Sequence, residues 1–120
     1  MSDLTIYHNP RCSKSRQTLE LIRGAGLEPE IVLYLEDVPS SADLNDALKM
    51  LGMKPQELLR RGEHDFKEHF GDVGKMNDHE IIERMRSYPK VIERPIVINQ
   101  GKAVIGRPPE NVFGILGTPS

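Results

Sequence analysis

The chain of 120 residues contains a single cysteine, Cys12. One cysteine cannot form an intrachain disulfide, and it lacks the partner cysteines that a cysteine zinc site requires. Cys12 is therefore either a small buried apolar residue or a reactive thiol. Its local setting has to decide between the two.

The sequence also lacks long apolar runs and a strong net charge. No stretch approaches the roughly 20 apolar residues needed to cross a bilayer, and no signal-peptide pattern precedes the first motif. A formal net charge of −2 gives no indication of a nucleic-acid or membrane partner. We therefore expect a cytoplasmic protein. A composition that is 38% hydrophobic and 28% charged is typical of one globular domain over residues 1–120.

The N-terminal third has the pattern of a strand, a helix and a second strand. A β-prone run around residues 4–7 ends at the turn signal Asn9-Pro10. Apolar residues then recur at helical spacing over about 13–23, and a second run rich in β-branched and aromatic residues covers 30–35. Two strands joined by one helix are expected to be parallel.

The middle third is predicted to be helical. Ser40 followed by Asp43 resembles a capping box, and Asn77 followed by Glu80 matches one, so each pair predicts a helix start. A short helix is expected to begin at Pro55 and run to about residue 60. The polar, glycine-containing stretch 62–76 is interpreted as a loop or a partly helical excursion.

The last third returns to strand patterns and completes a recognisable order of elements. Two short apolar runs, "PIVIN" and "KAVIG", flank Asn99-Gln100-Gly101 and predict a hairpin, and Pro108-Pro109 introduces a closing helix. The order is that of an α/β, thioredoxin-like fold. It predicts a mixed four-stranded sheet with a helical insertion at about 40–88.

The predicted position of Cys12, at the start of a helix, favours the reactive thiol. Unpaired backbone N–H groups and the positive end of the helix dipole both stabilise a thiolate there. Arg11, Lys14 and Arg16 add positive charge, and Ser15 can donate a hydrogen bond to sulfur. His8 could stabilise the thiolate if protonated, or position it through the loop.

Spacing argues against three other chemistries. A dithiol redox motif needs a second cysteine where this chain has Ser15. A cysteine phosphatase loop needs an arginine where Thr18 stands. A metal site is not expected, because His64, His69 and His79 show no ligand spacing with a second ligand type.

Five motifs in order resemble the glutaredoxin- and glutathione-linked arsenate reductases, which are ArsC-like members of the thioredoxin-like superfamily. The motifs, which together cover nearly the whole chain, are "HNPRCSKSR", "LYLEDVPS", "LLRRGE", "ERPIVI" and "IGRPPE". The cysteine motif alone would be a weak signal. All five in sequence are a strong one.

This resemblance implies reduction of arsenate to arsenite, a role in arsenic detoxification, and glutathione and glutaredoxin as reductants. It maps the nucleophile onto Cys12 and the anion-binding arginines onto Arg60, Arg94 and Arg107. His8 and Ser15 match positions that resemble thiolate-supporting neighbours in that family. Two further supporting residues are Arg16, for its charge near the thiol, and Pro95, for its expected cis bond. The resemblance implies no tightly bound cofactor and no metal, with glutathione as a co-substrate.

Elementary chemistry agrees with these assignments. Arsenate is an oxyanion, and a thiolate must approach it against its charge, so forked arginine donors would relieve the repulsion and hold its oxygens. In thioredoxin-like folds a cis proline begins the strand beside the active cysteine. A cis Arg94-Pro95 bond is therefore predicted.

Two other functions stay open from the sequence. One is an Spx-like regulator that binds RNA polymerase, against which Ser15 speaks because those regulators commonly use two cysteines. The other is a thiol oxidoreductase of the same fold that acts on glutathione adducts. No nucleic-acid or membrane partner is expected for this protein, and the modest length favours a monomer.

Overall fold

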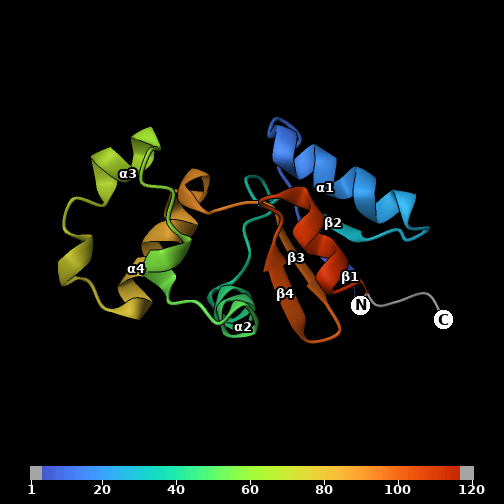
Figure 1. Ribbon diagram of the computed structural model, residues 1–120. Coiled ribbons are helices and arrows are strands. Elements are labelled where there is room, and N and C mark those ends of the chain that lie inside the picture. The colour runs from blue at the N-terminus through green and yellow to red at the C-terminus, as the bar shows by residue number, and fades with distance from the viewer. Residues whose placement is uncertain (1–3, 117–120) are drawn as a thin grey trace. The chain divides into compact units, whose positions relative to one another are not determined.

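The computed structural model describes residues 4–116 and divides into two compact units. The sheet unit comprises residues 1–37 and 94–120, and the helical unit comprises residues 38–93. Figure 1 labels the elements of both units.

The sheet unit is built on four strands in the order β2-β1-β3-β4. β1 (Leu4–Tyr7) pairs in parallel with β2 (Glu30–Val32) and antiparallel with β3 (Ile96–Asn99), which pairs antiparallel with β4 (Lys102–Ile105). This mixed four-stranded sheet confirms the predicted thioredoxin-like α/β architecture. The antiparallel hairpin follows from its turn, because Gln100 and Gly101 have positive φ angles of 50° and 80°.

The core of the sheet unit lies between the sheet and two helices. α1 (Ser13–Gly24) and the C-terminal 3-10 helix η4 (Pro109–Gly114) contact each other and cover one face of the sheet (Figure 1). Helical spacing in α1 directs Leu19 and Ile22 toward that face. The buried residues of this core are Leu4, Ile6, Leu19, Ile22, Val97 and Val112.

The helical unit contains three α-helices and three 3-10 helices among its residues 38–93, all of which the structure describes. These are α2 (Ser41–Leu51), η1 (Pro55–Leu58), α3 (His64–His69), η2 (Val73–Lys75), α4 (Asp78–Ser87) and η3 (Pro89–Val91). The predicted caps are present: the side chains of Ser40 and Asn77 accept hydrogen bonds from the backbone N–H groups three residues later. Gly52, with φ of 69°, ends α2 in the left-handed conformation.

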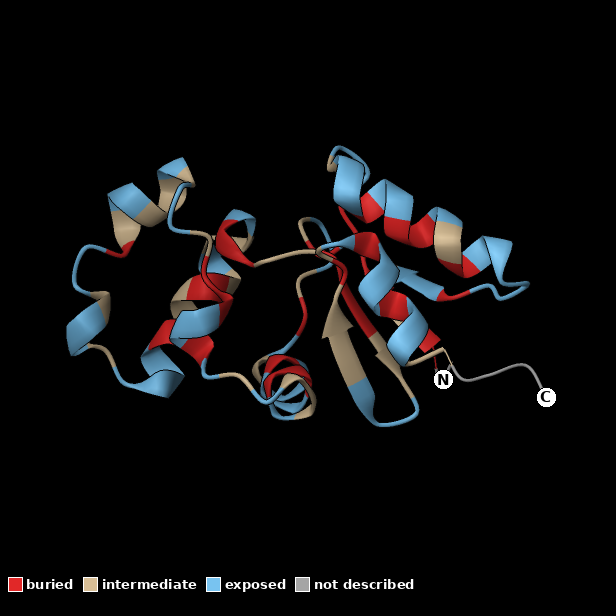
Figure 2. Cartoon of the chain, viewed as in Figure 1, coloured by how far each residue is buried: buried red, intermediate tan, exposed pale blue. Residues whose placement is uncertain are grey.

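Buried apolar residues of α2, η1, α4 and η3 form the interior of the helical unit, and Figure 2 colours buried positions red. An isolated antiparallel bridge between Leu59 and Ile92 ties the segment after η1 to the segment after η3. The buried apolar residues in this unit are Leu44, Ala47, Leu48, Leu58, Leu59, Phe70, Ile81, Ile82, Met85, Val91 and Ile92.

Three predicted elements differ from the structure in extent or type. The second strand ends at Val32, because Leu33 begins a turn in which its carbonyl accepts hydrogen bonds from the N–H groups of Glu36 and Asp37. The helix expected from Pro55 to about residue 60 is a 3-10 turn that ends at Leu58, and the closing helix is also 3-10. The stretch 62–76, by contrast, is partly helical, with α3 and η2, as one of its two predicted forms had it.

The organisation of residues 1–120 as one domain stays a prediction. The helical unit, residues 38–93, extends a few residues beyond the insertion expected at about 40–88. Among the described residues, no helix is long and apolar enough to span a membrane.

Candidate active site

Cys12 lies at the junction between the loop after β1 and the first turn of α1, where it is the N-cap residue. Its own N–H donates to the carbonyl of Asn9 at 3.0 Å, and its carbonyl accepts from the N–H of Arg16 at 3.0 Å. These two bonds fix the backbone on both sides of the sulfur. Cys12 is half-buried, so its thiol remains accessible to a reactant.

The donors around the Cys12 sulfur come from three segments of the sheet unit. Burial raises the pKa of the thiol, but backbone N–H groups of Ser15 and Lys14 and the side chain of Arg94 outweigh burial and lower the pKa below its ordinary value of 9.0. Arg107 adds a donor, with Nη2 3.5 Å from the sulfur. This is the setting of a reactive thiolate.

Arg94 and Arg107 are joined to each other through the backbone. Arg107 Nε donates to the carbonyl oxygen of Arg94 at 2.9 Å, which orients the guanidinium group that reaches the sulfur. Each arginine precedes a cis proline, at Arg94-Pro95 and Arg107-Pro108. The predicted cis Arg94-Pro95 bond is therefore present, whereas the second cis bond was not predicted.

A close contact between α1 and the segment after β4 brings Arg107 to the cysteine. Gly106 is buried against Thr18, and its N–H donates to the carbonyl of Pro95 at 2.9 Å. A Cβ at position 106 would lie 2.5 Å from Thr18 Oγ1 and 2.8 Å from Pro95 Cγ. Only glycine permits this approach without movement of the neighbours.

His8 and Ser15 form a buried pair behind the cysteine loop. His8 Nδ1 lies 2.6 Å from Ser15 Oγ, and the N–H of Asn9 donates to the same oxygen at 3.1 Å. Burial lowers the pKa of His8 below 6.5, with Arg23 and Arg16 acting in the same direction. This lower pKa disfavours a protonated His8 imidazole, which was one of the two roles expected from the sequence. His8 instead positions the loop through its hydrogen bond with Ser15.

Arg16 and Asn9 hold the remaining turn of the loop. Arg16 Nη1 donates to the carbonyl of Pro10 at 2.9 Å, and Asn9 Oδ1 accepts from the N–H of Arg11 at 3.0 Å. The first bond connects the loop to α1, and the second holds the turn between Asn9 and Arg11 within the loop.

Arg60 belongs to the helical unit, where it has two acidic neighbours. Its Nη1 lies 3.6 Å from a Glu63 carboxylate oxygen, and its Nε lies 3.6 Å from Glu93. The backbone N–H of Arg60 donates to the carbonyl of Val91 at 2.7 Å. The structure thus brings Cys12, Arg94 and Arg107 together within the sheet unit. The Arg60 side chain belongs to the helical unit, where it lies beside Glu63 and Glu93.

Three supporting residues were not found from the sequence. Asn9 was seen only as a turn signal, and Thr18 only as the residue in place of a phosphatase arginine. Asn111 Nδ2 donates to the carbonyls of Ile105 and Arg107, which holds the segment that carries Arg107. Asn side chains often hydrogen-bond to nearby backbone groups in turns, and Asn111 closely follows Pro108-Pro109. This is the one local signal that could have indicated Asn111.

Comparison with known proteins agrees with this geometry. Residues 7–115 match the model of the ArsC family, a range that contains Cys12, the three arginines and every supporting residue named above. The chain belongs to the ArsC family. Among the described residues of this ArsC protein, no group of three or more His, Cys, Asp or Glu side chains could hold a metal ion.

The ArsC chain is similar to several known relatives over nearly its full length. It is 51% identical over 113 residues to the uncharacterized protein YfgD of Escherichia coli strain K12, covering 93% of this chain and 95% of the relative. It is 40% identical over 116 residues to an arsenate reductase of Escherichia coli, covering 97% of this chain and 82% of that protein. The solved arsenate reductase of Vibrio cholerae superposes with a TM-score of 0.90 at 41% identity, covering 94% of this chain and 97% of that one.

Proposed function

We propose that this protein reduces arsenate to arsenite, with Cys12 as the nucleophile and with glutathione and glutaredoxin as reductants. Membership of the ArsC family and similarity to several arsenate reductases support arsenate as the substrate. The motif resemblance supports the choice of reductants.

The observation that carries this proposal is the convergence of Arg94 and Arg107 on the Cys12 sulfur. A thiolate and an arsenate ion repel each other, and two guanidinium groups at the sulfur reduce that repulsion. The donors that stabilise the thiolate can turn toward arsenate oxygens as the charge moves from sulfur to oxygen. A site built only to bury a cysteine would not place two cations there.

The first step forms a bond between sulfur and arsenic. The Cys12 thiolate attacks arsenic(V), and one arsenate oxygen leaves with protons as water, which gives a thiol-arsenate ester with arsenic still at +5. Arg94 and Arg107 would bind the remaining oxygens. Arg60 is proposed as the third anion-binding arginine, on the strength of the matching motif "LLRR".

The second step transfers two electrons. The thiolate of glutathione attacks the Cys12 sulfur, so that a disulfide forms as the sulfur–arsenic bond breaks, and that electron pair reduces arsenic to +3. Arsenite leaves. A glutaredoxin thiolate then attacks the glutathione sulfur of the mixed disulfide. A glutaredoxin–glutathione disulfide forms, and Cys12 leaves as a thiolate.

Ser15 explains why an external thiol is needed. It occupies the position where a dithiol motif has its second cysteine, and Cys12 is the only cysteine of the chain, so no internal disulfide can form. We propose the cytoplasm as the location, because glutathione keeps thiols reduced there. We also propose a monomer without a tightly bound cofactor.

The test is arsenite formation by purified protein supplied with arsenate, glutathione and glutaredoxin. We expect turnover in the complete mixture and none in Cys12→Ser or without glutaredoxin. Lys102→Gln removes an exposed charge from β4 of the same unit, and it should keep the wild-type rate.

Two results would contradict the proposal. Full activity of Cys12→Ser would exclude the cysteine mechanism. No arsenite from the complete mixture, combined with turnover of a glutathionylated peptide, would identify a thiol oxidoreductase instead.

A further inference from the structure

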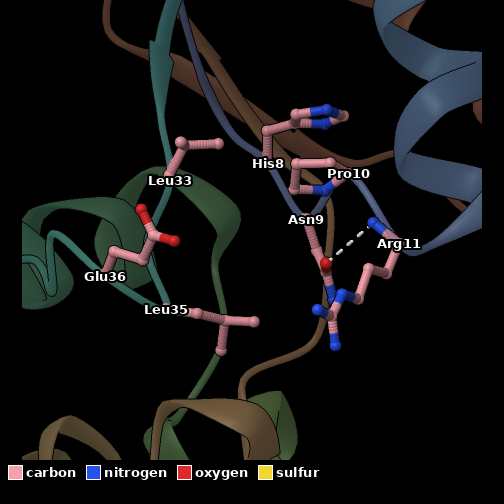
Figure 3. Close-up of a pocket in the computed structure, with 7 residues that line it drawn as sticks. All are labelled: His8, Asn9, Pro10, Arg11, Leu33, Leu35 and Glu36. Atoms are coloured by element: carbon pink, nitrogen blue, oxygen red, sulfur yellow. Dashed lines mark hydrogen bonds between the residues drawn. The ribbon is translucent and has the colours of Figure 1, made fainter.

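A pocket of about 200 Å³ lies beside the cysteine loop, within the sheet unit (Figure 3). One wall is the backbone turn from His8 to Arg11, and the other is the turn that follows β2, with Leu33, Leu35 and Glu36. The His8 ring points away from Leu33, toward its bond with Ser15 in α1. The turn that ends β2 at Val32, earlier than the sequence predicted, therefore forms one wall of this pocket.

The pocket combines an apolar wall with two opposite charges. Leu33 is 36% exposed, so it offers apolar surface to the pocket. Figure 3 shows Arg11 and Glu36 on opposite sides, with Leu35 extending from the Glu36 side toward Arg11. Among residues 4–116, neither the Arg11 guanidinium nor the Glu36 carboxylate has a hydrogen bond or ion pair, so both can bind a ligand.

These features select a small zwitterion as the occupant. A ligand carboxylate would pair with Arg11, a ligand ammonium with Glu36, and methylene groups would pack on Leu33 and Leu35. Arsenate carries no positive or apolar group, so it would leave Glu36 and the leucines without a partner. Pockets that enclose a drug-sized ligand measure about 300–1,000 Å³, and this smaller one fits only one end of such a ligand.

We infer that this pocket binds the γ-glutamyl end of glutathione, which carries an ammonium, a carboxylate and two methylene groups in one residue. The inference rests on the proposed function, because it names where that reaction's co-substrate binds. Arg11 directly precedes Cys12, with about 3.8 Å between their Cα atoms. A γ-glutamyl residue held at Arg11 therefore binds beside the loop that carries Cys12, and the adjoining cysteinyl residue would extend along that loop to bring its thiol to the Cys12 sulfur.

Binding is measured first, without any reaction, with the unreactive probe S-methylglutathione and isothermal titration. We expect binding to wild type, and at least fivefold weaker binding to Arg11→Gln and to Glu36→Gln. Lys102→Gln and Glu30→Gln remove one exposed charge of each sign from the same unit, and they should bind as wild type does. S-methyl-cysteinylglycine, which lacks the γ-glutamyl residue, should bind at least fivefold more weakly to wild type.

Kinetics provides the second measurement. In Arg11→Gln and Glu36→Gln we expect the KM for glutathione to rise at least fivefold. In Glu36→Gln, which leaves the positive charges beside the thiolate in place, kcat at saturating glutathione should stay unchanged. Wild-type binding by both variants, in an enzyme that does turn over arsenate, would overturn this inference and leave the proposed function intact. Charge-dependent probe binding in a protein with no arsenate turnover would support the pocket and reject the proposed function.

Discussion

His8 Nδ1 and Ser15 Oγ lie 2.6 Å apart, and both side chains are buried beneath the loop that carries Cys12. The pair connects the end of β1 to the first turn of α1. Because the N–H of Asn9 donates to the same serine oxygen, one hydroxyl group organises both the histidine and the loop. The serine hydroxyl thus keeps two buried polar partners hydrogen-bonded, which an apolar side chain at this position could not do.

The first prediction concerns stability at mildly acidic pH. Burial lowers the pKa of folded His8 below its ordinary value of 6.5, with Arg23 and Arg16 contributing, so the unfolded chain binds more protons as pH falls through 6.5. The free energy of unfolding should therefore fall from pH 7.5 to pH 5.5, and urea denaturation at several pH values measures it. His8→Asn should flatten this part of the profile. An equally steep decline in the variant would locate the effect elsewhere.

The second prediction concerns the reactivity of the thiol. Although burial opposes it, hydrogen bonds from Ser15, Arg94 and Lys14 lower the pKa of Cys12 below 9.0. Alkylation by iodoacetamide, followed against pH, should have its midpoint below 9.0 in wild type. Arg94→Gln should move the midpoint upward, because it removes both a donor and a positive charge. Lys102→Gln is the control and should leave the midpoint in place.

The third prediction tests the contact that positions Arg107. Gly106→Ala would place a methyl group 2.5 Å from Thr18 Oγ1, so the variant should lose about 1–3 kcal/mol of unfolding free energy. Gly24→Ala is matched chemically but has no atom within 4 Å of the new Cβ, and in a helix it should be neutral or stabilising. Chemical denaturation of both variants gives the comparison. Adding Thr18→Ala to Gly106→Ala should recover part of the loss.

Local chemistry was sufficient to predict most of the fold. Ser40, Asn77 and Gly52 act at helix ends through bonds to residues a few positions away, so short sequence patterns reveal them. The hairpin at Gln100-Gly101 is equally local. The second strand was predicted too long because an apolar run does not distinguish a paired strand from a turn. The strand ends at Val32 because the Leu33 carbonyl accepts hydrogen bonds from the N–H groups of Glu36 and Asp37 and so begins a turn.

The site was predictable only in part, because its supports act over long distances in sequence. Motifs predicted Cys12, Arg94 and Arg107, which the structure brings together, and the expected helix start explained why a thiolate is favoured there. Thr18 and Gly106 are separated by 88 positions, and no local pattern indicates that one must be small because of the other. The pocket wall at Leu33 was not predicted, because Leu33 was assigned to a strand and not to the turn that follows it.

The last prediction separates the roles of two arginines. Arg94 contacts the Cys12 sulfur, whereas the charged neighbours of Arg60 are Glu63 and Glu93 at 3.6 Å. If Arg60 binds arsenate as proposed, Arg60→Gln should lower kcat/KM for arsenate about 10²-fold, the effect of losing one oxyanion donor. It should leave the iodoacetamide midpoint of Cys12 unchanged.

Arg61→Gln is the matched control for Arg60. The Arg61 guanidinium lies over the Phe66 ring, 5.2 Å from its centroid, so its loss should affect stability slightly and turnover not at all. Arg60 and its acidic neighbours are each more than a quarter exposed, so the stability change in Arg60→Gln should stay below about 1 kcal/mol. A loss of turnover with folding intact therefore reports on anion binding. Equal losses in both variants would instead assign Arg60 a structural role in the helical unit.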